Sequence, residues 1–167
     1  MKIIINTAGT IEAYCPDSLD ASGHYPRCLI LTIPDGTPVK IGQAWEVSLE
    51  QAVAARISEA TAACDAVLAP LGVEYGRWET ATWDQQYAEA TALMANPTAA
   101  VPLITALAQA RGMDVGVLAQ RIIRNRETWS VLTGSVIGQR LAIVDKINAA
   151  TKVEQVMGVD VTITLPG

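Results

Sequence analysis

Residues 75–86 read Tyr75-Gly76-Arg77-Trp78-Glu79-Thr80-Ala81-Thr82-Trp83-Asp84-Gln85-Gln86, and they open an alanine-rich block that extends to residue 150. Gln85 follows Thr82 by three positions, which is the spacing of a capping box at a helix start. Apolar residues then recur every three or four positions, as on one face of a helix. The block holds almost no reactive side chains. We therefore expect a helical domain without catalytic groups.

Helical periodicity begins before this block. Three pairs of residues have capping-box spacing, namely Ser48 with Gln51, Thr82 with Gln85, and Thr151 with Glu154. The first pair opens a helix that ends at Pro70 and Gly72. Its expected apolar stripe consists of Leu49, Val53, Ile57, Ala60, Cys64 and Leu68. Asn96-Pro97 ends the helix that Thr82 begins.

Two more helices are expected in the second half of the chain. Thr98 is a candidate cap for a helix that reaches Arg111, and Gly112 closes it. Asp114 caps the next helix, whose stripe includes Leu118, Ile122, Trp129, Ile137, Leu141 and Ile147. At residues 133–135 the helix either breaks or continues as one longer helix that glycine weakens locally. The short helix after Thr151 completes the set.

The two ends of the chain have the character of β-structure. Residues 2–6 and 11–14 predict a hairpin, residues 28–33 a strand, and residues 42–45 another short strand. Residues 159–165 alternate as a strand that can pair with the N-terminal ones. We therefore predict an α+β fold: a β-rich part over residues 1–46, a bundle of four to five helices over 47–158, and a C-terminal strand over 159–167.

Charge and composition exclude several classes of protein. The chain of 167 residues carries a net charge of -5. A negative net charge opposes electrostatic attraction to DNA. Residues 1–110 hold five basic and twelve acidic groups, whereas residues 111–146 hold six basic and three acidic. No apolar run approaches the roughly 20 residues of a bilayer span. We expect no membrane association, reduced cysteines and, as synthesised, a cytoplasmic location.

Candidate reactive groups are few. His24 is the single histidine, and with Cys15 and Cys28 it lacks the spacing of a metal site. No nucleophile elbow and no phosphate-binding loop occur. Cys28 and Cys64 lie in apolar patterns typical of core residues. We therefore predict no catalytic residue, no metal and no cofactor.

The basic stretch offers one alternative function. Residues 103–126 resemble a degenerate helix-turn-helix, with Ala108, Gly112 and Leu118 at workable offsets. A phage-type DNA-binding regulator would use Arg121, Arg124 and Arg126 on phosphates. However, the second helix is rich in aliphatic residues rather than base-reading side chains. Nucleic acid is therefore not the partner we expect first.

Three groups of residues in the block 75–150 carry a likeness to a known family. They are Glu79-Thr80-Ala81-Thr82-Trp83-Asp84-Gln85-Gln86 with Glu89-Ala90; Pro102-Leu103 with 106–108 and Ala110-Arg111-Gly112; and Gly134, Gly138-Gln139-Arg140 and Ile147-Asn148-Ala149-Ala150. On these residues the block resembles a domain of tailed-phage and prophage tail proteins, including tail-fibre and fibre-assembly proteins. Residues 1–13 are similar to the starts of such proteins, whereas residues 14–70 carry no likeness.

The resemblance implies a structural role. Such proteins are parts of the tail or help to assemble it, so we expect a non-enzymatic protein that acts through contacts with other phage tail proteins. Homo-oligomerisation and presence in the virion stay open. Trp45 and Trp78 stand just before helices, and tryptophan is enriched in interface hot spots. We expect these two side chains to be exposed anchors, and Trp83 to serve the core.

Overall fold

The computed structural model describes residues 1–166, except 7, 20, 22–23, 26–27 and 74. Contacts within the chain group it into two compact units. Unit 1 comprises residues 1–67 and 136–164, and unit 2 comprises 68–135 and 165–167. Over the described residues there are three strands and six helices, which confirms the α+β class. The helical part is shared between the two units, whereas the sequence suggested one bundle over 47–158.

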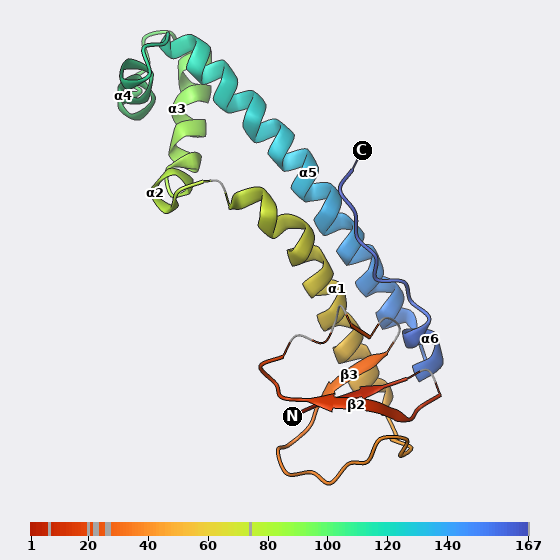
Figure 1. Cartoon of the computed structure of the whole chain (residues 1–167). Helices are drawn as coiled ribbons and strands as arrows, with labels where there is room; N and C mark the ends of the chain where they lie inside the picture. The colour runs from red at the N-terminus through yellow and green to blue at the C-terminus, as the bar shows by residue number, and fades with distance from the viewer. Residues whose placement is uncertain (7, 20, 22–23, 26–27, 74, 167) are drawn as a thin grey trace. The chain divides into compact units, whose positions relative to one another are not determined.

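The sheet of unit 1 has three antiparallel strands. β1 (Lys2–Ile5) is central, β2 (Ile11–Cys15) and β3 (Leu29–Thr32) flank it, and the order is β2-β1-β3 (Figure 1). Ile3 lies opposite Tyr14 on one side and Leu31 on the other. The hairpin and the strand after residue 28 are therefore confirmed. Ile3, Ile4 and Ile5 are buried almost completely.

The fourth strand expected at residues 42–45 is reduced to a single bridge. Thr10 pairs with Ala44, and the Ile11 amide donates to the Gln43 carbonyl at 2.9 Å. Gly42 has a φ of 83°, a left-handed conformation that favours glycine. The backbone therefore turns at this point and cannot continue as a strand along β2.

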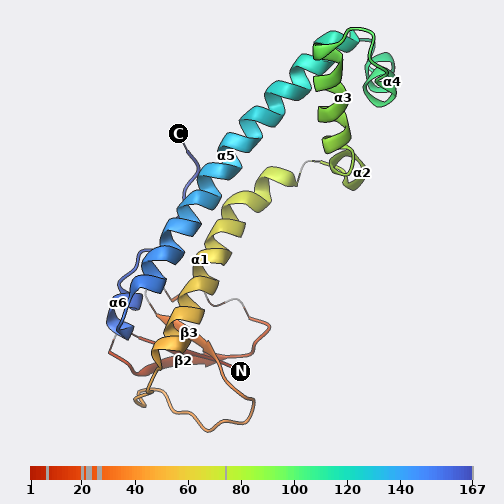
Figure 2. The ribbon, with the colours of Figure 1, turned by 180° about the vertical axis from the view of Figure 1, so that it is seen from behind.

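In unit 1, the first part of α1 (Leu49–Gly72) runs beside the last part of α5 (Val115–Ala149), as both views show (Figures 1 and 2). The capping box is present, because the Gln51 amide donates to Ser48 Oγ and the Ser48 amide donates to Gln51 Oε1. The buried residues differ in part from the predicted stripes. They are Ala52, Arg56, Ala60 and Cys64 on α1, and Val136, Ile143 and Ile147 on the unit 1 part of α5.

The predicted inward position of Ile137 and Leu141 is wrong, since these side chains are 41% and 49% exposed. The buried positions 136, 143 and 147 follow steps of seven and four residues, which keep one helix face toward the neighbouring elements. Ile137 and Leu141 lie one and two positions off that face. Their hydrophobicity alone could not reveal which apolar positions the fold would cover.

α6 (Val153–Met157) and the strand-like segment after it complete unit 1. The predicted Thr151–Glu154 capping pair is not formed, because the Thr151 amide and hydroxyl donate to Gln155 Oε1 instead. The segment from residue 159 does not join the sheet. Near its end, the Gln139 side chain accepts from the Thr164 amide at 3.1 Å and donates to the Thr164 carbonyl at 2.9 Å.

Unit 2 contains three helices and the first part of α5. They are α2 (Arg77–Thr80), α3 (Trp83–Ala95) and α4 (Pro102–Ala110). The expected capping box at Thr82 is wrong: Thr82 has helical φ and ψ rather than the extended values of a side-chain cap, and its hydroxyl accepts from Gln86 Nε2. Thr98 does not cap α4 either, because the N-cap position of α4 is Val101.

α4 begins at Pro102, where proline is tolerated, and its first turn is capped from another helix. The Ile104 amide donates to Glu89 Oε2 of α3 at 3.0 Å. Gly112, with a φ of 62°, ends the α4 region, and Asp114 Oδ1 accepts from the Val117 amide as predicted. α5 is one helix of 35 residues without a break at 133–135. The core of unit 2 consists of Ala90, Val101, Ile104, Ala108, Leu118 and Ala119.

Candidate functional site

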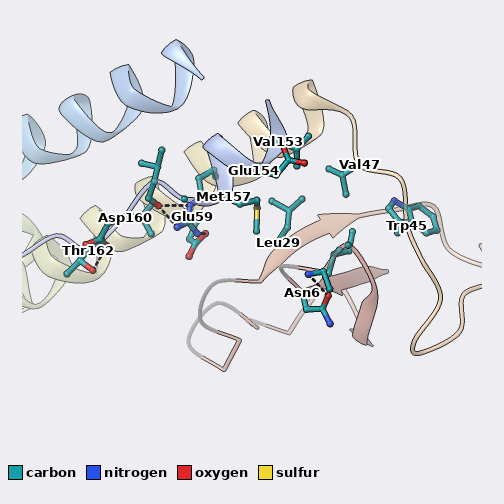
Figure 3. A pocket seen from close by; sticks show the side chains of 17 residues that line it. Asn6, Leu29, Trp45, Val47, Glu59, Val153, Glu154, Met157, Asp160 and Thr162 are labelled. Atoms are coloured by element: carbon teal, nitrogen blue, oxygen red, sulfur yellow. Dashed lines mark hydrogen bonds and ion pairs between the residues drawn. The ribbon is translucent and has the colours of Figure 1, made fainter. Parts of the chain in front are cut away.

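Unit 1 contains a pocket of about 1070 Å³ between the end of the sheet, α1, α6 and the segment 158–162 (Figure 3). Five separate stretches of the chain line it. Its lining residues are Ile5, Asn6, Ala8, Gly9, Leu29, Trp45, Val47, Arg56, Glu59, Val153, Glu154, Met157, Gly158, Val159, Asp160, Val161 and Thr162. The volume lies at the upper end of what small-molecule sites enclose.

Apolar side chains form much of the wall. Figure 3 shows Trp45 and Val47 at one end, with Met157 and Leu29 facing each other in the middle. Trp45 is half-buried here, so it belongs to the pocket wall and is less exposed than the sequence suggested. Such a surface favours the burial of apolar groups of a ligand.

Arg56 of α1 fixes one side of the pocket. Its side chain is only 6% exposed, and its Nε and Nη2 both donate to the Val159 carbonyl, with an Nε–O distance of 3.1 Å. Nη1 forms an ion pair of 2.6 Å with Glu59 Oε2. These bonds satisfy a buried guanidinium and hold the strand-like segment against α1. Arg56 therefore has a structural role, and its guanidinium is engaged by Val159 and Glu59 within the fold.

Two further carboxylates lie on the pocket lining. Asp160 accepts hydrogen bonds from the Thr162 amide and hydroxyl at 2.9 and 2.7 Å, and these bonds hold the pKa of Asp160 below its usual value. Arg56 and Lys146 add smaller contributions in the same direction. Among the described residues, neither Asp160 nor Glu154 forms an ion pair. The pocket lining therefore carries net negative charge.

A second candidate surface lies in unit 2, near the start of the alanine-rich block 75–150. Val73, Tyr75 and Trp78 are 79%, 44% and 78% exposed. The Arg77 guanidinium lies 5.3 Å from the centre of the Trp78 ring, within the range of a cation–π contact. We call Val73, Tyr75, Arg77 and Trp78 the Trp78 surface. Trp78 is thus exposed, as the sequence predicted.

The aromatic residues next to this surface support it from within unit 2. The rings of Tyr75 and Trp83 meet edge to face at 5.0 Å, and those of Trp83 and Trp129 lie 6.1 Å apart. Trp83 is half-buried, consistent with its expected role in packing. Edge-to-face contacts of this kind are favourable and restrict ring motion. The Trp78 surface is therefore attached to a packed aromatic cluster.

The three arginines proposed for phosphate binding have different environments. Arg126 forms an ion pair of 2.9 Å with Asp84 and lies 5.8 Å from the Tyr87 ring centre. Arg121 and Arg124 are exposed on α5. α4, the turn at Gly112 and the start of α5 follow one another where the sequence resembled a helix-turn-helix, and Ala108 of α4 shares a core with Leu118 of α5.

Two of the residues considered for metal binding or catalysis lie together, because Cys15 packs against the small core cluster that contains Cys28. His24 is exposed, and the Cys28 thiol is buried and donates to Glu12 Oε2 at 3.4 Å. Burial, followed by this hydrogen bond, raises the pKa of the Cys28 thiol to about 11. Within the described part of the chain, no three potential metal ligands lie together. Cys28 is therefore a poor nucleophile at neutral pH.

Comparison of the chain with protein-family models, curated proteins and solved structures finds no match. Over the described residues, no helix has both the length and the apolar character that crossing a membrane requires. The sequence interpretation identified Trp45 and Trp78 but missed Arg56, Glu154 and Asp160. The one signal for Arg56 was its register, since it stands four residues from Ala52 and four from Ala60 on α1.

Proposed function

We propose that this chain is a non-enzymatic, bacteriophage or prophage tail or tail-fibre-associated protein that acts in structure or assembly through protein–protein contacts. The observation that carries the proposal is the Trp78 surface at the start of the tail-like block. Trp78 is 78% exposed and Val73 is 79% exposed. Exposed apolar side chains of this size, where they gather into one patch, are typical of surfaces that another protein covers.

The composition of the Trp78 surface supports a protein partner. Tryptophan, tyrosine and arginine are the residue types most enriched in interface hot spots, and this surface combines Trp78, Tyr75 and Arg77. The stacking of Arg77 on Trp78 and the packing of Tyr75 on Trp83 restrict side-chain motion before binding. A partner therefore meets a partly ordered surface, which lowers the entropy lost on association.

The DNA-binding regulator is the alternative, and one observation favours it: Arg121 and Arg124 are exposed on the helix that follows the Gly112 turn. Its third arginine is less suited, because Arg126 is engaged by Asp84 and by the ring of Tyr87. The net charge of -5 also opposes attraction to a polyanion. A role in protein contacts accounts for the exposed residues of the Trp78 surface, whereas DNA binding does not.

A photo-cross-linking experiment in the phage or induced prophage tests the proposal. Trp78 is replaced by the photoreactive amino acid benzoylphenylalanine, and cross-linked proteins are identified by mass spectrometry after irradiation. The matched control carries the same amino acid at Glu127, an exposed residue of unit 2 outside the Trp78 surface. We expect tail proteins to be cross-linked from position 78 and not from position 127. Equal labelling from both positions would contradict the proposal.

A further inference from the structure

The pocket of unit 1 has an apolar wall and, along one side, a stretch of backbone without regular pairing. The segment 159–164 is strand-like but lies outside the three-stranded sheet. The Val159 amide donates to the Val156 carbonyl, and the Val159 carbonyl accepts from Arg56. The Thr162 amide donates to Asp160 Oδ1, and the Thr164 amide and carbonyl both bond to the Gln139 side chain. Between them, the Val161 amide and carbonyl have no partner in the described part of the chain.

A strand-like segment of this kind can accept a second strand. Peptides that bind by strand addition gain affinity from main-chain hydrogen bonds and specificity from pockets that receive alternate side chains. Here Val161 lies on the lining of a pocket whose other walls contain Leu29, Val47 and Met157. At about 1070 Å³, the pocket has room for several residues of an extended peptide.

The charges of the pocket define the peptide further. The three nitrogens of the Arg56 guanidinium donate to Val159 and Glu59. Its positive charge is therefore paired with Glu59 within the fold. Asp160 and Glu154 remain on the lining without a cation in ion-pair contact in the described chain. Beside an apolar wall, two such carboxylates favour a ligand that brings its own positive charge.

We propose that this pocket binds an extended peptide segment of a partner protein, with apolar side chains for the Leu29–Met157 wall and at least one lysine or arginine for Glu154 and Asp160. The proposal rests on the proposed function, since it takes the partner to be a protein. It adds a second contact region, in unit 1, and it states the chemistry of the segment that fits there.

Selection from an unbiased peptide library tests this inference with the full chain. An mRNA-displayed library of random dodecapeptides is passed over immobilised protein, and the selected peptides are compared with those that bind the double variant Glu154→Lys/Asp160→Asn. Asparagine at 160 keeps the side-chain oxygen that accepts from Thr162. The control is Glu50→Lys, an exposed change on α1 outside the pocket lining. Circular dichroism establishes that each variant is folded.

We expect selected peptides that alternate apolar residues with lysine or arginine. By fluorescence anisotropy at low salt, the double variant should bind the best peptide about tenfold more weakly than the unchanged chain and the Glu50→Lys control. No enriched motif, an acidic motif, or equal affinity in all three proteins would overturn the inference. Light scattering that shows a dimer dissociated by the double variant would overturn it in favour of a second copy. The peptide assay uses purified protein and the pocket of unit 1. A negative result there therefore does not count against the Trp78 cross-linking experiment.

Discussion

Replacement of Arg56 by methionine provides a sharp test of the structure of unit 1. Methionine keeps most of the length of the buried side chain but removes the guanidinium. The Val159 carbonyl then loses both of its donors, and Glu59 loses its ion-pair partner. Among the described residues, the hydrogen bonds to the Val159 carbonyl come from Arg56.

The expected loss of stability follows from these two changes. A carbonyl left without its hydrogen-bond partners in a partly buried place destabilises the fold by about 1–3 kcal/mol. Glu59 is 28% exposed, so water can solvate it, and the loss of its ion pair adds only about 0–1 kcal/mol. We therefore expect Arg56→Met to lower the free energy of unfolding by about 1–4 kcal/mol.

Urea unfolding followed by circular dichroism measures this difference. The matched control is Arg121→Met, an exposed arginine on α5 whose replacement should change the free energy of unfolding by less than about 0.5 kcal/mol. Equal stability of Arg56→Met and the unchanged chain would show that the hydrogen bonds from Arg56 to Val159 do not exist in solution. A large effect of the control would show that charge removal alone destabilises the protein.

The remaining predictions concern unit 2, the buried thiol and nucleic acid. Glu89→Ala removes the acceptor for the Ile104 amide and should lower the free energy of unfolding by about 1 kcal/mol in urea titrations. Trp78→Ala should leave that free energy within about 0.5 kcal/mol of the unchanged chain, because the ring is mostly exposed, while binding of the cross-linked partner is lost. Since its pKa is about 11, Cys28 should stay protonated at pH 9 and react more slowly with iodoacetamide in the folded chain than in urea, as measured by mass spectrometry. A duplex-DNA titration at low salt should show no binding.

Each of these has an outcome that contradicts it. An unchanged unfolding midpoint for Glu89→Ala would remove the cap on α4, and a strongly destabilised Trp78→Ala would show that the ring is buried in solution. Rapid alkylation of Cys28 at pH 9 in the folded chain would contradict its buried position. Duplex binding that weakens steeply with added salt would favour the regulator over the tail protein.

Local chemistry was predictable where both partners lie close in sequence. The capping box of Ser48 and Gln51 forms with both of its hydrogen bonds. Thr82 and Gln85 have the same spacing, yet Thr82 follows the turn of α2 with helical φ and ψ, and its hydroxyl accepts from Gln86 Nε2 instead. The sequence pattern could not reveal that backbone conformation. The class of fold and the hairpin of β1 and β2 also followed from local patterns.

The candidate site was much less predictable, because it joins distant residues. Pattern reasoning places an arginine on the solvent side of a helix, whereas Arg56 is buried by a contact with Val159, 103 positions further along the chain. The pocket likewise needs β1, β3, α1, α6 and their connecting segments in one place. Trp78 is exposed as expected, although it lies in α2 and not before a helix as the sequence suggested. Its residue type, which is enriched in interface hot spots, does not depend on tertiary contacts.

Deletion of the coding sequence from the phage or prophage tests the central claim most directly. Particles are counted by infectious titre and their tails inspected by negative-stain electron microscopy, with the unchanged chain and Trp78→Ala supplied in trans. The account predicts particles with missing or incomplete tails or fibres, restored by the unchanged chain and not by Trp78→Ala. Intact, fully infectious particles in the deletion would contradict it.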